Sequence, residues 1–280
     1  MIDYKLHENG WTVIIENLDL RDARQQDIDD ICKLIAKYTC VVIRNQLLEL
    51  DDEVRVLDMF KDPFAFNSEV LSHPDKAGYR GCIVPHSKDY IIRVTAALDA
   101  YGNPGFAGME EELQWHCNDA THADRRQVTW LYAVEGSHGS RTTWNNNVLS
   151  YRDLDEDTKQ KIQNVKAKMC HWTDGEEGQE HFTPNIVHTN LAGQTGLFFP
   201  FLQISRFVGM SKEESDEFKQ PLVEHTTQEK YMYHHDWRDG DLIISEQSLG
   251  IHKRWPFPDM KNRLLHRAVM DFNDLDYTNI

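Results

Sequence analysis

The sequence predicts an α+β fold with a mainly β core, an antiparallel barrel or jelly roll with a few helices on its outside. Short β-rich runs separated by turn residues recur along the 280 residues, whereas only a few segments have helical spacing. Many short strands joined by turns are typical of antiparallel sheets that close up or pack in pairs. No repeat, linker or low-complexity segment divides the chain, so we expect one domain over residues 1–280.

The first third of the chain alternates between strands and helices. Residues 11–15 (WTVII) form a short β-rich run, and 40–43 (CVVI) is a buried strand by its β-branched content. Asp27 is placed to cap a helix, and 51–60 has the spacing of a second one. The apolar stripe of the first helix consists of Ile28, Ile31, Leu34 and Ile35.

The remainder is richer in strands. Residues 61–112 are rich in turns and contain one plausible strand, 91–95. Ser211 and Glu214 have the spacing of a capping box, which predicts a helix over 211–222. A further helix is expected over 151–168, strands over 128–134, 241–245 and 264–272, and aromatic β-prone sequence over 198–201.

Charge and composition limit the function classes. The formal net charge of −16 argues against sequence-independent binding of nucleic acid, because the phosphates would be repelled. No run of about 20 apolar residues predicts a membrane span, and Met1 to Gly10 lack the pattern of a secretory signal. The five cysteines contain no C-x-x-C pair and are typical of reduced thiols. We therefore expect a cytoplasmic protein.

The stretch Gln114 to Thr121 (QWHCNDAT) concentrates groups that can bind a metal. Non-haem Fe(II) oxygenases hold iron with two imidazoles and one carboxylate on one face of the ion. We expect His116 to be the first ligand. The second imidazole is expected from His252, which follows the buried run 241–245 and precedes a basic segment.

Two arginines follow the distal histidine. Arg263 lies eleven positions after His252, and Arg267 lies four positions after Arg263. In a strand, residues four apart share a face, so both guanidinium groups are expected to enter one cavity. A guanidinium is the best bidentate partner for a carboxylate in a dry pocket.

In order and spacing, these motifs resemble the taurine/2-oxoglutarate dioxygenases (TauD/TfdA-like). The likeness covers almost the whole chain and rests on Arg44-Asn45-Gln46, Trp115-His116, Thr142-Thr143-Trp144 with Tyr151, His188 to Leu197, Trp237 to Asp241, and His252 with Arg263 and Arg267.

The resemblance implies a double-stranded β-helix (jelly-roll, cupin-like) with flanking helices, and Fe(II) and 2-oxoglutarate as cofactors. Arg263 would anchor the 2-oxoglutarate with the help of Thr142 or Thr143. Arg267 would belong to the same cofactor site and would also contact an anionic substrate. Molecular oxygen would convert 2-oxoglutarate to succinate and CO₂ while a C–H bond of a small substrate is oxidised, usually by hydroxylation. The resemblance also allows a homo-oligomer.

One departure from the family pattern leaves the third ligand open. The family's His-x-Asp would place the carboxylate at 118, where this sequence has asparagine, and Asp119 follows one residue later. Either a one-residue bulge brings Asp119 to the metal, or Asn118 takes the position; a charged oxygen favours Asp119. Asp119 could instead orient His116 from outside the ligand set.

The departure also leaves alternative functions open. They are a 2-oxoglutarate-dependent halogenase, a catalytically inactive member that acts as a binding protein, and a cupin-like metal enzyme that needs no 2-oxoglutarate. Arg263 argues against the last of these. For substrate contacts we expect Arg267, His122 and one phenylalanine of the 198–201 run, Phe199, but the sequence does not identify the substrate.

Overall fold

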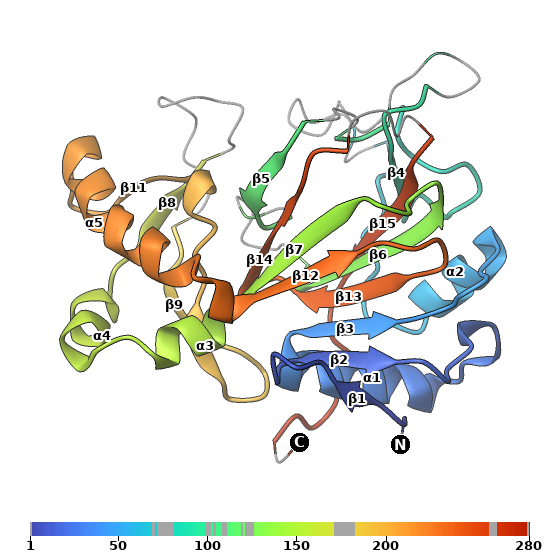
Figure 1. Ribbon diagram of the computed structural model, residues 1–280, viewed down its shortest axis with the longest axis horizontal. Coiled ribbons are helices and arrows are strands. Elements are labelled where there is room, and N and C mark those ends of the chain that lie inside the picture. Colours follow the sequence, from blue (N-terminus) through green and yellow to red (C-terminus); the bar gives the residue numbers. More distant parts are fainter. Residues whose placement is uncertain are drawn as a thin grey trace.

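Two β-sheets form the core of the protein (Figure 1). The computed structural model describes residues 2–68, 71, 81–98, 102, 105–107, 111–118, 120, 126–170, 183–257, 262–278 and 280. The larger sheet has seven strands in the order β1 (Lys5–Leu6), β2 (Thr12–Ile15), β3 (Cys40–Ile43), β13 (Leu242–Glu246), β6 (Val128–Glu135), β15 (Leu264–Met270) and β4 (Ile92–Val94). The smaller has four, in the order β12 (Met232–Asp236), β7 (Arg141–Asn146), β14 (Gly250–Arg254) and β5 (Leu113–His116).

The central strands of the larger sheet are buried on both faces, which explains the apolar runs in β3 and at the start of β13. Along β13, Leu242 and Ile244 pack in the cluster that includes helix α1 (Gln25–Tyr38) and helix α2 (Leu50–Leu57), whereas Ile243 points the other way. On that other face, Ile243 joins a cluster with Trp144 of β7 and Tyr233 of β12. The larger sheet therefore packs helices on one face and the smaller sheet on the other.

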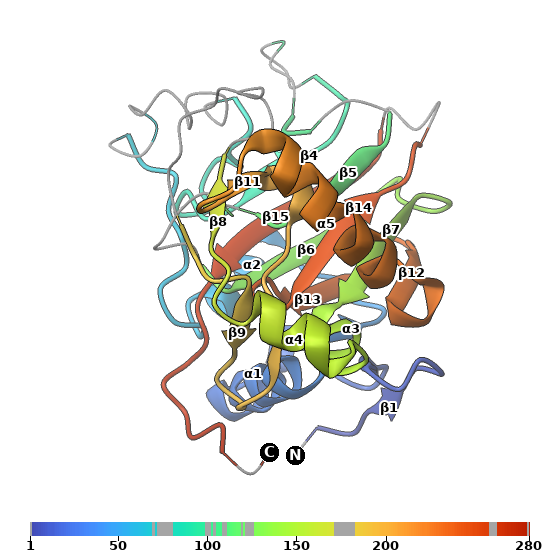
Figure 2. The same cartoon turned by 90° about the vertical axis from the view of Figure 1, so that its left-hand side faces the viewer.

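The chain between β7 and β12 forms the side of the molecule that faces the viewer in Figure 2. It contains α3 (Asn147–Arg152), α4 (Glu156–Ile162), β8 (Ala167–Met169), β9 (Val187–Thr189), β10 (Thr195–Leu197), β11 (Ile204–Phe207) and α5 (Lys212–Thr226). Short 3-10 helices lie at Leu20–Asp22, Phe201–Gln203 and Glu229–Tyr231. An apolar cluster of its own, which includes Phe199, Phe201 and Phe207, joins this segment to β5 through Trp115.

Most predicted elements are present, and the predicted fold class is confirmed. Three details of the prediction are wrong. The helix expected over 151–168 is two helices, α3 and α4, because Asp155 accepts a hydrogen bond from the Thr158 N–H and starts a new helix; residues 167–169 are strand β8. Residues 198–201 form no strand. Asp27 is the third residue of α1 and accepts the Arg24 N–H at 2.9 Å, so the helix begins before it.

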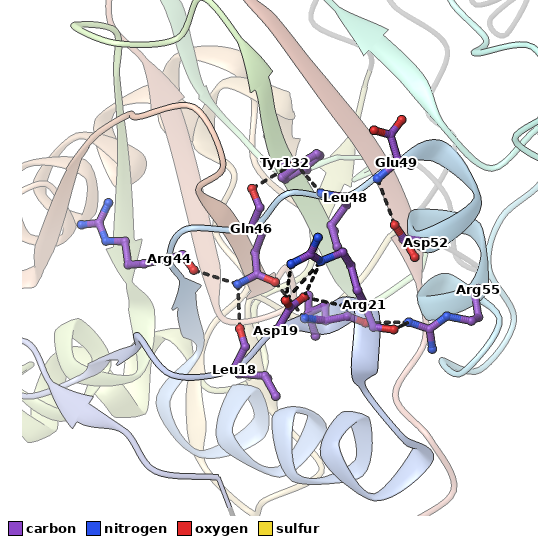
Figure 3. A network of polar contacts seen from close by, with 11 residues as sticks. Leu18, Asp19, Arg21, Arg44, Gln46, Leu48, Glu49, Asp52, Arg55 and Tyr132 are labelled. Carbon is purple, nitrogen blue, oxygen red and sulfur yellow. Dashed lines mark hydrogen bonds and ion pairs between the residues drawn. The ribbon is translucent and has the colours of Figure 1, made fainter.

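A buried glutamine, Gln46, holds the turn after β3 in place (Figure 3). Its Oε1 accepts the N–H of Leu20 at 2.9 Å. Its Nε2 donates to the carbonyl oxygens of Leu18 and Arg44, each at 2.7 Å. One side chain thus ties the end of β3 to the segment that leads into α1, which gives the Arg-x-Gln motif a structural role.

The turn before β13 closes against the same glutamine. Gly240 has a φ of +84°, and a Cβ at this position would lie 2.6 Å from the carbonyl oxygen of Gln46. The next residue, Asp241, accepts a hydrogen bond from Nη1 of Arg44 at 2.6 Å. Only glycine fits both the backbone conformation and this close approach.

Within the described part of the chain, no helix combines the length and the apolar content that crossing a membrane requires.

Candidate functional site

The two histidines expected to bind metal lie next to each other. His116 of β5 and His252 of β14 are register partners in the smaller sheet, and their ring centroids are 4.2 Å apart. Both side chains are buried and both line a pocket between the two sheets. The sheet register therefore brings together two imidazoles that are 136 positions apart in the sequence.

Both imidazoles are held in the neutral form that a metal requires. Burial lowers the pKa of His116 to about 4, and burial also lowers the pKa of His252 well below its usual value. Nδ1 of His116 lies 2.6 Å from the carbonyl oxygen of Gln114, which can only accept, so Nδ1 carries the proton. The lone pair of His116 is then on Nε2.

The pocket is strongly cationic. Its apolar lining includes Val94, Phe106, Leu113, Leu131 and Leu265. Its polar lining consists of the two histidines, Asn118, Thr142, and three arginines, Arg254, Arg263 and Arg267. No carboxylate lies among the described lining residues, so the pocket suits anionic ligands.

Arg263 is the most deeply buried of these cations, with 1% of its surface exposed. Its Nε donates to Oγ of Ser140 at 2.9 Å, whereas Nη1 has no hydrogen-bond partner among the described residues. Burial lowers the pKa of Arg263 to about 9, so the group remains charged at neutral pH. A buried cation with an unused donor fits a ligand carboxylate, which would offset the cost of burying the charge.

Arg267 and Asn118 form one hydrogen-bonded unit. Nη1 of Arg267 donates to Oδ1 of Asn118 at 2.8 Å, and Nδ2 of Asn118 donates to Oγ1 of Thr129 at 3.1 Å. The backbone N–H of Asn118 donates to Oε1 of Gln247 at 2.9 Å. Both polar atoms of the Asn118 amide therefore have hydrogen-bond partners, and this arrangement positions the guanidinium of Arg267.

The two adjacent threonines face opposite sides of β7. Thr142 lines the pocket, and its Oγ1 accepts the indole N–H of Trp237 at 2.9 Å. Thr143 lies on the other face, where Oγ1 contacts Nδ1 of His234 at 2.7 Å and accepts the indole N–H of Trp255 at 2.8 Å. Of the two, Thr142 is positioned beside the arginines.

Arg254 is a pocket residue that the sequence motifs do not single out. It lies two positions after His252 on β14 and therefore on the same face, which is the signal that could have identified it. Its Nη1 and Nη2 donate to the carbonyl oxygens of Ala107 and Glu111, at 2.7 and 2.9 Å. The guanidinium groups of Arg254 and Arg263 both lie over the ring of Phe257, at 4.5 and 4.9 Å from its centroid.

Of three other predicted site residues, two are not described by the structure and one lies away from the pocket. Asp119 and His122 fall outside the residues that the structure describes. Phe199 is fully buried in the apolar cluster of the segment between β7 and β12, with its ring centroid 5.7 Å from that of Phe201. It is not among the pocket's lining residues.

The described residues fit the expected Fe(II) and 2-oxoglutarate. Two neutral imidazoles lie side by side, and the unused Nη1 of Arg263 belongs to the same pocket. No group of three His, Cys, Asp or Glu side chains suited to a metal occurs within the described ranges. A complete ligand set therefore needs one further ligand.

Comparison with known proteins gives one family over nearly the whole chain. Residues 4–269 match the family described as taurine catabolism dioxygenase TauD, TfdA family. The chain is 23% identical to an alpha-ketoglutarate-dependent 2,4-dichlorophenoxyacetate dioxygenase of Burkholderia sp. (strain RASC), over 91% of this chain and 89% of that protein. It is also 23% identical to pentalenolactone F synthase of Streptomyces arenae, over 73% of this chain and 76% of that one.

Solved structures support the fold. The crystal structure of AAD-2 in complex with Mn(II) and N-oxalylglycine superposes with a TM-score of 0.77 at 17% identity, covering 99% of this chain and 98% of the other. A taurine dioxygenase from Burkholderia xenovorans superposes with a TM-score of 0.72 at 17% identity, covering 94% and 86%.

Proposed function

The chain belongs to the TauD/TfdA family of dioxygenases, and on this premise we propose that it hydroxylates a C–H bond of a small anionic substrate. The protein is a 2-oxoglutarate-dependent non-haem iron dioxygenase, as its family and relatives indicate. The observation that carries the proposal is the buried Arg263, whose unused Nη1 lies in the same pocket as the His116–His252 pair.

Each pocket residue has a defined task in this proposal. His116 and His252 bind Fe(II) as neutral imidazoles. Arg263 receives the distal carboxylate of 2-oxoglutarate, and the hydroxyl of Thr142 adds a second contact to it. When bound, iron with 2-oxoglutarate supplies the activation of oxygen and the oxidising power for the substrate C–H bond. The apolar side chains between the sheets keep water away from the reacting groups.

We assign the third metal position to Asp119. The amide of Asn118 already has Arg267 and Thr129 as partners, and a carboxylate oxygen binds Fe(II) better than an amide. Asn118 then has a different task, because it fixes the guanidinium that would meet the anionic group of the substrate. This assignment favours hydroxylation over halogenation, since halogenation requires a vacant ligand position.

A spectroscopic titration tests the metal and cosubstrate assignment. Anaerobic Fe(II) with 2-oxoglutarate should give the weak visible metal-to-ligand band in the wild type. His116→Ala and Arg263→Ala should lose it, because each removes a direct contact. The matched controls His138→Ala and Arg152→Ala remove the same residue types from exposed positions and should keep the band. Absence of any binding of iron or 2-oxoglutarate by the wild type would overturn the proposal.

Succinate release separates the two candidates for the third ligand. Asp119→Ala should lose most of the succinate formed, whereas Asn118→Ala should retain metal binding and mainly raise the KM for an anionic substrate. The reverse result would assign the ligand to Asn118. A chlorinated product whose yield depends on the chloride concentration would show that the protein is a halogenase and not a hydroxylase.

A further inference from the structure

A continuous row of aromatic side chains leads away from the two histidines. In the smaller sheet, His116 is the register partner of His252, His252 of Trp144, and Trp144 of Tyr233. Cross-strand partners point to the same face of a sheet, so these four rings lie side by side on β5, β14, β7 and β12. The register thus connects the pocket with Tyr233 at the far strand of the sheet.

Each ring of this row packs closely on the next. Trp144 stacks on His252, with the ring centroids 6.0 Å apart and the planes inclined by 20°. The centroids of Trp144 and Tyr233 are 6.4 Å apart. Electron transfer between side chains slows exponentially with distance, so rings packed in this way allow fast transfer from one to the next.

The row ends at Tyr233, whose hydroxyl contacts a base. The indole N–H of Trp144 donates to Oγ of Ser245 at 3.2 Å, and a neutral hydroxyl is a poor proton acceptor. Nε1 of Trp11, whose ring lies 6.4 Å from that of Tyr233, has no hydrogen-bond partner within the described residues. The hydroxyl of Tyr233, in contrast, lies 2.9 Å from Nδ1 of His235.

The positions of the protons in the contact between Tyr233 and His235 follow from the second partner of His235, which is Asp241. Nε2 of His235 lies 3.0 Å from Oδ2 of Asp241, which also receives hydrogen bonds from Nη1 of Arg44 and from the Arg238 N–H. A carboxylate that accepts these donors keeps the imidazole proton on Nε2. Nδ1 of His235 therefore carries a lone pair, and the Tyr233 hydroxyl donates to it.

This arrangement suits oxidation of a tyrosine. A phenol that loses an electron becomes strongly acidic, so oxidation is easier when a base is already hydrogen-bonded to the hydroxyl. His235 is such a base, and Asp241 stabilises the imidazolium that would result. Tyr233 is buried, with 3% of its surface exposed, and burial raises its pKa. It therefore stays a neutral phenol until it is oxidised.

We infer that Trp144 and Tyr233 form an electron-transfer path that protects the active site when oxygen reacts without a substrate. The inference rests on the proposed function, because the oxidant is formed at the metal site from oxygen and 2-oxoglutarate. Trp144 gives one electron to the oxidised site and becomes an indole radical cation. Tyr233 then gives one electron to Trp144 and its phenolic proton to Nδ1 of His235.

Charge and electrons balance in this sequence. The metal site is reduced by one electron, Trp144 returns to its starting state, and Tyr233 becomes a neutral phenoxyl radical beside the His235 imidazolium. An external one-electron reductant of the ascorbate class restores Tyr233, which takes its proton back from His235. A second passage through the row would supply the second electron that returns the metal site to Fe(II), and water would supply the two protons for the oxygen atom that leaves. The ring of His7, at 5.0 Å from that of Tyr233 and partly exposed, lies between the radical and solvent.

Freeze-quench electron paramagnetic resonance tests the path. Protein loaded with Fe(II) and 2-oxoglutarate is mixed with oxygen in the absence of substrate, with ring-deuterated tyrosine incorporated to identify a tyrosyl signal. The wild type should give that signal. Tyr233→Phe keeps the ring and should lose the signal, and Trp144→Phe should lose it although Tyr233 is present. His235→Gln replaces the base by an amide and should also lose it.

Matched variants separate electron transfer from packing. Tyr132→Phe and Trp130→Phe alter buried rings of the larger sheet that are outside the row, and both should keep the signal. Peptide mass spectrometry of the same samples should show oxygen added to Trp144 and to pocket residues in Tyr233→Phe, but not in the wild type or the controls. Circular dichroism checks that each variant is folded.

Succinate measured in the same samples distinguishes failure of the electron-transfer path from failure of the proposed function. Succinate without a tyrosyl signal in the wild type would overturn the path and leave the proposed function intact. A signal that persists in Tyr233→Phe or Trp144→Phe would overturn the path as well. If neither the metal-to-ligand band nor succinate is seen, the proposed function fails and the path fails with it.

Discussion

Glu246 is a buried carboxyl group that forms no ion pair with any residue in the described part of the chain. Its Oε2 accepts Nδ2 of Asn190 at 2.9 Å, its Oε1 accepts the hydroxyl of Ser248, and 3% of its surface is exposed. Burial raises the pKa of Glu246 to about 7 from its ordinary value of 4.5. Folding therefore favours the protonated form, in contrast to the carboxylates that pair with lysine or arginine on the surface.

This shift predicts a pH dependence of stability. Between pH 4.5 and about 7 the unfolded chain loses the Glu246 proton while the folded chain keeps it, so the free energy of unfolding falls as the pH rises. The loss is about 3 kcal/mol at most. Glu246→Gln should remove this pH-dependent loss of stability. At pH 8 the variant should therefore unfold at a higher urea concentration than the wild type, whereas at pH 4 it should not. The exposed Glu135→Gln is the control, and an unchanged pH profile in Glu246→Gln would contradict the prediction.

The sequence alone predicts some of the residues of the candidate site. The four-residue spacing of Arg263 and Arg267 is enough to predict that both enter one pocket, because side chains along a strand return to the same face every two residues. Arg254 follows the same two-residue repeat of a strand, but no sequence motif pairs it with another arginine. Which threonine faces the pocket depends on the register between β7 and its neighbours, and one sequence does not fix that register.

At the scale of elements, the turn before β13 depends on a glycine that no other residue can replace. A side chain at Gly240 meets two penalties, a left-handed backbone and a contact with the Gln46 carbonyl oxygen. Gly209 has the same φ of +84°, but a Cβ on this residue would have no neighbouring atom within 4 Å. A substitution at Gly209 therefore measures the cost of the left-handed backbone alone.

Alanine substitutions at these glycines should therefore differ. Gly209→Ala should lower the free energy of unfolding by about 1 kcal/mol, the cost of left-handed alanine. Gly240→Ala should cost about 3 kcal/mol or more, because the turn must also move away from Gln46. Urea denaturation measures both. Equal losses would show that the close approach relaxes without cost.

Element prediction from sequence succeeds where one local signal dominates. Helix α5 follows from the capping box of Ser211 and Glu214, whose contacts are both present. Strand β3 follows from its continuous β-branched content, and β6 and β13 follow from β-prone runs of mixed residue types. Residues 151–168 have helical spacing throughout, but Asp155 offers a better start for a second helix than the middle of a long one does. Competition between local signals is resolved by packing, which the sequence alone does not display.

The pocket joins the two sheets of the molecule. Arg267 lies on β15 and Arg263 lies directly before it, whereas His116 and His252 lie on β5 and β14. A ligand that binds both sides should stabilise the folded chain as a unit. Mn(II) with 2-oxoglutarate at 100 times its Kd should raise the free energy of unfolding by about 2.7 kcal/mol. A chelator should abolish the thermal shift, and Arg263→Ala should lack it. A full shift in Arg263→Ala would place the cosubstrate elsewhere.

The aromatic row in the smaller sheet limits which insertions and deletions the chain could accept during evolution. Inserting one residue in β7 would turn Trp144 and Thr142 to the opposite face at once, so such length changes are excluded from the four strands. The described residues of the long segment between β7 and β12 contribute nothing to the lining of the pocket, so that segment does not share this constraint. Gain or loss of residues in descendants of this chain is therefore expected in that segment, while the four strands would change by substitution.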